Sequence, residues 1–269
     1  GILRLNGTSI AVGGLSTAGS MGGANIVDNG NASAGLAIKN ASGNIFNGTL
    51  ANGSIGTLSI TKSGAGTMSL TGLNTYTGST TVTQGILQLN RTGGSTLPSG
   101  NSVSVSGMGS VLRISSDQTL NNVTLSTGGK LQVDAGVTLT ITGTYNPATC
   151  FVQNDGTIRL QGSALQNFPG TNASVISMNN LIINNAFGVN LNKSINVTGV
   201  LTLTNGAFTV GANTLTINNP VAGTVANLSA NNTSSITIAG TAAGVNIPAS
   251  VSQLNNLTVS NSVGTALQG

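Results

Sequence analysis

The sequence is built from very short apolar segments that recur along the chain, and this cadence constrains the fold more than any other feature. Between residues 64 and 90, three such segments, 67–70, 80–83 and 86–89, are separated by turns rich in Gly and Asn. In each segment, β-branched or aliphatic residues alternate with polar ones. This pattern is typical of strands and does not fit a helix.

Similar segments lie on both sides of this stretch, at intervals of roughly 6 to 12 residues. Strands are expected before it at 2–5, 10–12, 26–27, 36–38 and 58–60, and after it at 103–105, 111–114, 120–125, 131–133 and 137–141. Three strands would make one coil of roughly 20–30 residues, the size typical of a stacked solenoid. The sequence therefore predicts an all-β parallel β-helix (β-solenoid) of short strands with Gly- and Asn-rich turns.

An antiparallel sandwich would also show short strands at regular spacing. Sandwich cores usually contain large side chains, whereas this chain has five Phe, two Tyr and no Trp. The narrow interior of a solenoid suits Val, Ile, Leu, Ala and Thr stacked in ladders ~4.8 Å apart. Asn and Gly tolerate the left-handed backbone of tight turns. Composition thus favours the solenoid.

The central stretch also carries a family resemblance. Residues 64–78 (GAGTMSLTGLNTYTG), followed by TTV at 80–82 and GILQL at 85–89, resemble the passenger-associated repeat of bacterial autotransporters and related giant surface proteins. Residues 85–90 (GILQLN) nearly copy residues 1–6 (GILRLN), so the chain begins inside a repeat. The resemblance covers 1–90 well and 91–145 loosely. It implies a parallel β-helix displayed at or beyond the bacterial surface.

The pattern changes near residue 147. Of 35 Asn, 14 lie in the first 150 residues and 21 in the remaining 119, and residues 179–185 are repeated at 255–261. We predict two sections: a passenger-associated-repeat β-helix over 1–147, and an Asn/Thr-rich β-solenoid over 148–269 that continues the same rod.

Charge is scarce and dispersed. Eight Lys and Arg stand singly, opposed by four Asp, for a formal net charge of +4. Nucleic-acid binding needs clustered cations that release counterions, so we expect no nucleic-acid partner. Residues 194–269 carry no charged side chain at all. Because net charge keeps soluble molecules apart, this segment favours self-association.

The residues needed for catalysis are nearly absent. The chain has no His and no Glu, and its carboxylates are Asp28, Asp117, Asp134 and Asp155. Asp117 and Asp134 are 17 positions apart, close to one coil, so they could lie near each other on one face, as the paired carboxylates of glycan cleavage do. Two solvated turn residues are the simpler interpretation. Ser–Lys pairs occur at 62–63 and 193–194, but sequence neighbours in a strand face opposite ways.

We therefore predict no enzyme, no catalytic, cofactor-binding or metal-binding residues, and no cofactor. The single Cys150 excludes an intrachain disulfide and a thiolate metal cluster. A buried apolar role for Cys150 is the simplest interpretation, and an intermolecular link is the alternative. The apolar runs are far shorter than the ~20 residues of a membrane-spanning helix. Gly1 is not a natural start, so we expect signals and anchors to lie outside these residues.

The function predicted from these features is that of a structural module of a long extracellular bacterial surface protein. It would form a rod, fibre or sheath for adhesion or matrix building by associating with copies of itself or with neighbouring repeats. Three alternatives stay open: a monomeric autotransporter passenger stalk, a carbohydrate-binding or carbohydrate-cleaving β-helix with surface glycans as partners, and an ice-binding solenoid. Ice binding rests on the Thr-x-Thr pairs at 138–142, 202–204 and 214–216, and would require one in every coil.

Overall fold

The computed structural model describes residues 1–17, 25–147, 152–170 and 176–266. The chain divides into two compact units, unit 1 (Gly1–Leu139) and unit 2 (Thr140–Gly269). Both are β-solenoids of short parallel strands, with about 11 turns in all. In the described residues the one helical element is a 3₁₀ turn, η2 (Val225–Asn227). The predicted fold class is confirmed, and the division of the rod at residue 147 stays a prediction.

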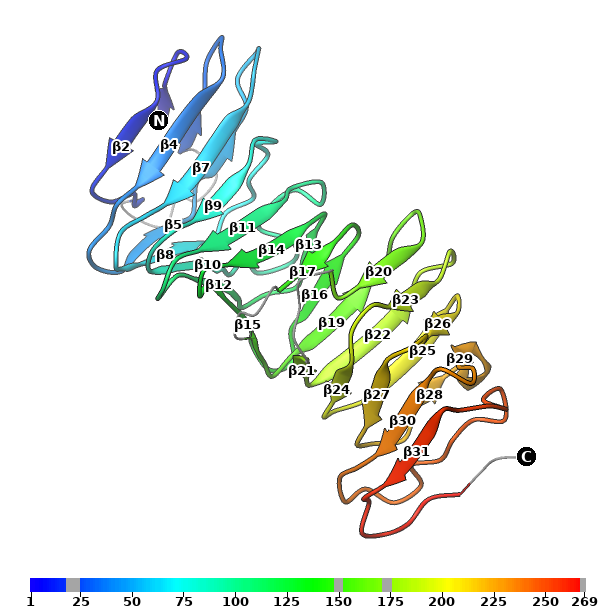
Figure 1. Cartoon of the computed structure of the whole chain (residues 1–269). Coiled ribbons are helices and arrows are strands. Elements are labelled where there is room, and N and C mark those ends of the chain that lie inside the picture. The colour runs from blue at the N-terminus through cyan, green and yellow to red at the C-terminus, as the bar shows by residue number, and fades with distance from the viewer. Residues whose placement is uncertain (18–24, 148–151, 171–175, 267–269) are drawn as a thin grey trace. The chain divides into compact units, whose positions relative to one another are not determined.

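The strands of unit 1 lie on the three faces of its coils. The first face holds β2 (Ile10–Val12), β4 (Ala34–Ile38), β7 (Leu58–Lys62), β9 (Thr80–Val82), β11 (Val103–Ser106) and β14 (Val123–Ser126), which lie side by side in Figure 1. The second holds β5 (Asn44–Phe46), β8 (Thr67–Leu70), β10 (Ile86–Leu89), β12 (Val111–Ile114) and β15 (Lys130–Val133). The third begins with β1 (Ile2–Arg4), β3 (Ile26–Asp28) and β6 (Thr49–Ala51); the short strand β13 (Gln118–Leu120) follows later in the chain.

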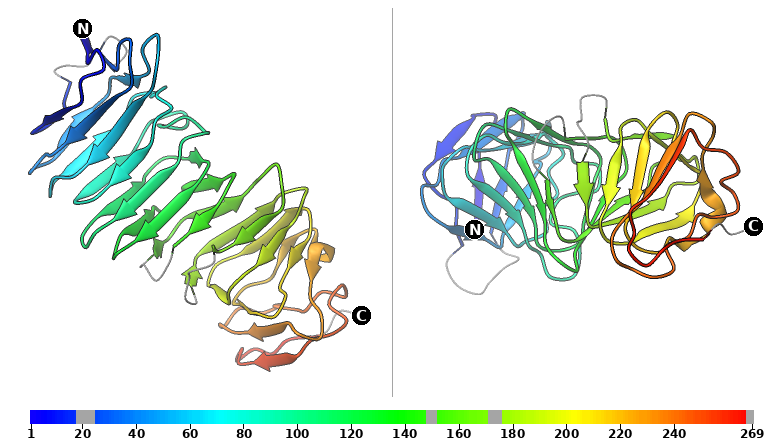
Figure 2. Two further views of the ribbon diagram at one scale, coloured as in Figure 1. Left: turned by 45° about the horizontal axis from the view of Figure 1, so that its top comes forward. Right: turned by 60° about the horizontal axis from the view of Figure 1, so that its bottom comes forward.

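Unit 2 repeats this arrangement, and Figure 2 shows its coils stacked one on the next. Its first sheet contains β16 (Thr138–Ile141), which crosses the boundary in sequence, then β19 (Thr157–Leu160), β22 (Asn180–Asn184), β25 (Leu201–Asn205) and β28 (Ala222–Gly223). The second contains β20 (Gln166–Phe168), β23 (Val189–Leu191), β26 (Phe208–Thr209) and β29 (Leu228–Ser229). The third contains β21 (Ile176–Met178), β24 (Ile195–Val197), β27 (Thr214–Ile217), β30 (Ser235–Ile238) and β31 (Asn256–Val259). The remaining strands are β17 (Tyr145–Asn146) and β18 (Val152–Asn154).

Successive coils pair in parallel and in register, which fixes the length of a coil. Paired residues lie from 19 positions apart (Val111 opposite Lys130) to 26 (Ile10 opposite Leu36). Alternate side chains point inward and form aliphatic ladders; Leu36 and Ile60, for example, face each other at 1% exposure. Each such side chain contributes ~1.5–3 kcal/mol on burial, so a solenoid of small aliphatic residues needs few aromatic rings.

The strands of the central stretch are confirmed, because β8 and β10 span 67–70 and 86–89 as expected and β9 ends one residue early, at Val82. One expected strand, 120–125, is wrong in detail. It is two strands, β13 and β14, which the turn at Asn121 and Asn122 separates. Strands β5 and β6 were not predicted. In β5 the apolar Ile45 points outward and is 61% exposed, which breaks the inward-apolar pattern on which the prediction relied.

Asn side chains link neighbouring coils by hydrogen bonds, mostly with backbone groups and less often with another Asn side chain. Asn29 Nδ2 donates to the carbonyl oxygens of Ala32 at 2.8 Å and Ile55 at 2.7 Å, and its Oδ1 accepts from the N–H of Gly53 at 2.6 Å. A direct amide ladder occurs between Asn218 Nδ2 and Asn196 Oδ1 at 2.7 Å. In the described part of the chain, no helix has the length and hydropathy to cross a membrane.

Candidate functional site

The segment 72–78 of the central stretch turns a corner without forming a strand, and one buried amide holds it. Asn74 is 1% exposed. Its Oδ1 accepts from the N–H of Leu50 at 2.8 Å, and its Nδ2 donates to the carbonyl oxygens of Thr96 at 3.0 Å and Gly72 at 3.2 Å. Asn74 thus joins the coil before its own to the coil after it.

Tyr76 lies inside the same corner. Its hydroxyl is 2.7 Å from Thr80 Oγ1, which in turn donates to Asn101 Oδ1 at 3.2 Å. Burial raises the pKa of Tyr76, and the hydrogen bond with Thr80 offsets only part of that effect. The phenol is therefore held neutral, and its position is that of a structural group.

Lys62, at the end of β7, points into the interior and is fully buried. Its Nζ donates to the carbonyl oxygen of Gly64 and to that of Gln84 at 3.1 Å. Burial lowers the pKa of Lys62. Across the described residues, Ser63 Oγ has no hydrogen-bond partner, Lys62 included.

The second Ser–Lys pair shows no hydrogen bond between its members either, as far as the described residues extend. Lys193 is exposed, and Ser194 Oγ accepts from the N–H of Thr214 at 2.9 Å. In neither pair does the Lys amine reach the Ser hydroxyl, so the arrangement offers no activated serine.

Asp134 is the best-coordinated carboxylate. Arg113 Nη2 lies 3.0 Å from Asp134 Oδ2, Ser115 Oγ donates to Oδ2 at 2.7 Å, and Gln132 Nε2 donates to Oδ1 at 3.0 Å. Burial alone would raise the pKa of Asp134, but the bonds from Arg113, Ser115 and Gln132 and the Arg113 charge outweigh it, so the pKa lies below its ordinary value. This carboxylate is held ionised.

Two of the other three carboxylates also have structural partners. Asp28 pairs with Arg4 Nε at 3.2 Å and accepts from the N–H of Gly30 at 2.9 Å. Asp117 accepts from the N–H of Thr138 at 2.8 Å, so it and Asp134 bond to different partners. Asp155 is exposed at a bend. Among the described residues, no three His, Cys, Asp or Glu side chains come together as metal ligands. Cys150 lies outside the described residues.

Thr side chains line up on the outer face of unit 2, but only over part of it. Thr216, Thr237 and Thr258 are in register on β27, β30 and β31. In the preceding coils the same column holds Asn196 and Ser177. The regular Thr-x-Thr array that ice binding would require is therefore not continuous along this sheet.

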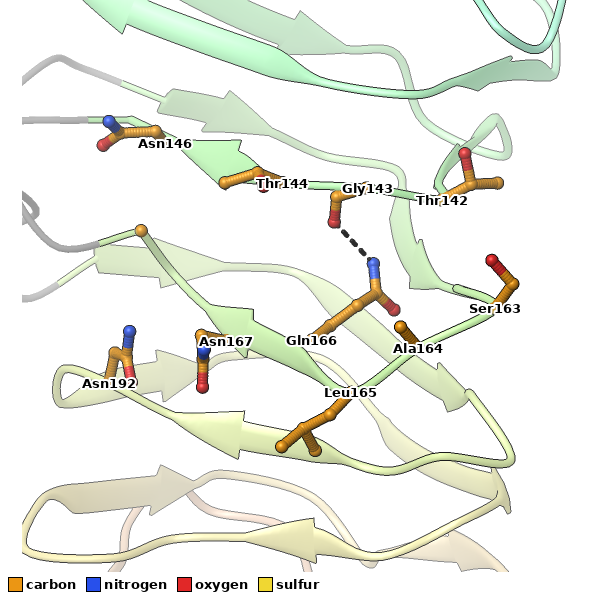
Figure 3. A pocket seen from close by; sticks show the side chains of 11 residues that line it. Thr142, Gly143, Thr144, Asn146, Ser163, Ala164, Leu165, Gln166, Asn167 and Asn192 are labelled. Atoms are coloured by element: carbon orange, nitrogen blue, oxygen red, sulfur yellow. Dashed lines mark hydrogen bonds between the residues drawn. The ribbon is translucent and has the colours of Figure 1, made fainter.

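Unit 2 contains a pocket of about 380 Å³ between the segment 142–146 and β20 (Figure 3). Gln166 lies in the middle of the lining, where its Nε2 donates to the carbonyl oxygens of Gly143 at 2.8 Å and Ile141 at 3.1 Å. Figure 3 shows Asn146, Asn167 and Asn192 toward one end of the pocket and Thr142 and Ser163 toward the other. The hydrogen-bonding side chains that line it, apart from Gln166, are those of Thr142, Thr144, Asn146, Ser163, Asn167 and Asn192.

The interior beside the pocket contains a pair of stacked aromatic rings. Tyr145 and Phe168 are both buried, and their rings stack with centroids 5.7 Å apart. Neighbouring strands in a ladder are ~4.8 Å apart. At the opening itself, the Gln166 amide bonds across to Gly143 and Ile141 in place of a backbone ladder.

The sequence did not single out any of these pocket residues, because Asn, Thr and Ser at this site are no different from those in every turn. One signal was available. Phe187 is one of five Phe in the chain, and it follows the polar pair Asn184 and Asn185. Its side chain is 63% exposed, one coil along from Ala164 and Leu165 at the pocket's edge.

Comparison with known proteins places the central stretch in a family. A family model described as the passenger-associated-transport-repeat matches residues 60–89, which include β8, β9, β10 and the Asn74–Tyr76 corner. Comparison with curated proteins and with solved structures finds no match. Residues 60–89 thus match an autotransporter passenger repeat and fold here as part of a β-solenoid.

Proposed function

We propose that this chain is a non-catalytic structural module in the passenger region of a long extracellular bacterial surface protein, and that its coils extend a rod or fibre by strand addition. The passenger repeat at 60–89 suggests a β-helical passenger region and implies a secreted or surface-exposed protein. Assembly by self-association and a role in adhesion or matrix building are the finer parts of the proposal.

The observation that carries the proposal is the face of the last described coil. Among the strands that the structure describes, β31 is the last of its sheet and pairs on one side only, with β30. Its inward-pointing Leu257 and Val259 are 39% and 48% exposed, whereas Ile236 and Ile238, at the same positions in β30, are 1% and 0% exposed. A further coil stacked on β31, supplied by a neighbouring repeat of the same protein or by a second copy, would bury these side chains and pair its open edge.

The absence of charge near this face supports the same conclusion. Residues 194–269 contain no Lys, Arg, Asp or Glu, so no like-charge repulsion opposes the approach of a second chain. Uncharged edge strands without Pro are the kind that pair with other strands.

The test is whether charge placed on the coil face blocks assembly. Leu257→Lys with Val259→Lys puts two cations where the next coil would stack, and we expect monomers at concentrations at which the parent chain forms oligomers or fibres. The control is the double variant Thr258→Lys with Thr237→Lys, which adds the same two charges to outward positions of β31 and β30. This control should still assemble.

The readouts are light scattering and electron microscopy of the undenatured protein. A parent chain that stays monomeric at high concentration would contradict self-association and leave a monomeric passenger stalk. Equal loss of assembly in the two double variants would show that net charge, not the coil face, controls assembly.

A further inference from the structure

We propose that the pocket of unit 2, between the segment 142–146 and β20, is a binding site for a neutral saccharide. This site lies away from the coil face of β31 and does not depend on self-association. Its volume, about 380 Å³, falls within the range of small-molecule sites, about 300–1,000 Å³.

The chemistry of the lining fits an uncharged, hydroxyl-rich ligand. Side-chain amides and hydroxyls, which both donate and accept hydrogen bonds, supply the polar groups, and none of the lining residues is ionisable. A charged ligand would lose its hydration here without gaining a counter-charge. Sugar hydroxyls are also both donors and acceptors, so each can pair with an amide or hydroxyl of the protein.

Two of the lining amides have spare bonding capacity. In the described part of the chain, the side chains of Asn167 and Asn192 make no hydrogen bond within the protein, whereas Gln166 is fully used. Such groups are available to a ligand without breaking any contact of the fold. The amide of Gln166 serves to keep the pocket open.

The backbone of β20 adds a donor and an acceptor. The N–H of Gln166 donates to Gly188 O at 3.2 Å, and Phe168 O accepts from the N–H of Asn192 at 2.8 Å. Consecutive peptide groups of a strand point to opposite sides. The N–H and C=O of Asn167, between these two residues, are therefore directed away from β23 and toward the pocket side of β20.

An extended peptide is a poorer occupant, because two hydrogen bonds cross the opening. The N–H of Gly170 donates to Tyr145 O at 2.6 Å, and Gln166 bonds to Gly143 O at 2.8 Å. A strand added to β20 would have to break one of these bonds to pass through. A compact ligand such as one or two sugar rings would fit between them without breaking either bond.

An apolar rim completes the site. Phe187 and Leu165 are 63% and 52% exposed, and Leu165 Cδ1 is 3.6 Å from the position of a β-carbon on Gly188. The two residues flank the same turn on adjacent coils, and a sugar ring can pack its C–H face on such a surface. Asn185 fixes this rim to the pocket, since its Oδ1 accepts from Phe187 N at 2.9 Å and its Nδ2 donates to Ala164 O at 2.8 Å.

The experiment is a titration of the full chain with neutral gluco-oligosaccharides and N-acetylglucosamine oligomers, followed by NMR shifts and calorimetry. An oligogalacturonate and an uncharged Asn/Thr-rich peptide serve as alternative probes. We expect binding of at least one neutral series, and losses of about 2- to 10-fold in affinity for Asn167→Ala, Asn192→Ala and Phe187→Ala, since each removes one contact. Asn232→Ala, at an exposed turn of the same unit, should bind like the parent.

Each other outcome overturns the proposal. No binding of either neutral series at millimolar concentration removes the site. Binding that the three variants leave unchanged places the sugar elsewhere, and preference for the oligogalacturonate or the peptide makes the ligand class wrong. Far-ultraviolet circular dichroism of each variant separates lost binding from lost folding.

Discussion

The phenol of Tyr76 and the hydroxyl of Thr80 lie 2.7 Å apart in the interior of unit 1, on the two sides of the corner at Gly78. Both residues belong to the repeat signature, and Asn101 of the next coil accepts the hydrogen bond of Thr80. The signature therefore specifies a buried polar corner, in which side-chain hydrogen bonds add to the backbone bonds that Thr75 and Tyr76 donate to the carbonyl oxygen of Leu50.

Tyr76→Phe removes the phenol and leaves the ring in place. Because Thr80 keeps Asn101 as a partner, we expect the free energy of unfolding to fall by only about 0.5–1.5 kcal/mol, the net contribution of one hydrogen bond. Tyr76→Ala also leaves a cavity and should cost about 3–5 kcal/mol. Urea denaturation of the full chain measures both. Equal effects of the two substitutions would contradict a role for the ring in packing.

Gly78 lets two coils approach closely at this corner. A β-carbon at Gly78 would lie 2.1 Å from the carbonyl oxygen of Leu58, which is backbone and cannot move aside cheaply. We expect Gly78→Ala to lower the free energy of unfolding by about 1–3 kcal/mol, the usual cost of overpacking. Gly100→Ala is the matched control, because nothing lies within 4 Å of a β-carbon there. A drop of similar size at Gly100 would show that steric contact is not the cause.

The bonds to Asp134 predict how unit 1 responds to acid. Because the folded-state pKa of Asp134 is lowered, its contribution to stability is present above the unfolded-state pKa, about 3.9, and is lost as pH falls through the folded-state value. Unfolding measured from pH 7 downward should therefore show a smaller acid-induced loss in Asp134→Asn than in the parent. Asp155→Asn, at an exposed bend, should keep the parent's pH profile. An unchanged profile for Asp134→Asn would be evidence against this network.

The solenoid fold could be predicted from the sequence because its signals are local and repeated. Strands such as β8 and β10 combine inward aliphatic residues with turn-forming Gly on either side, so their bounds follow from the pattern alone. The inward position of Lys62 could not be predicted in this way, since its neighbours Gly64 and Gln84 supply carbonyl oxygens only once the coils are stacked. The pocket could not be predicted either, because its lining residues Thr142 and Gln166 are 24 residues apart and come together only in the folded coils.

Lys62 gives the sharpest pH prediction at the alkaline end. Burial lowers its folded-state pKa, so between that value and about 10.4 the unfolded chain binds more protons, and stability rises with pH. The buried Tyr76 acts oppositely above about pH 10, where the unfolded phenol ionises first. The unfolding free energy of the parent minus that of Lys62→Met isolates the lysine, and this value should increase as pH rises toward 10.4. Lys39→Met, at an exposed site in the same unit, should show no such trend. A Lys62→Met difference that does not vary with pH would mean that the amine is hydrated in the folded protein.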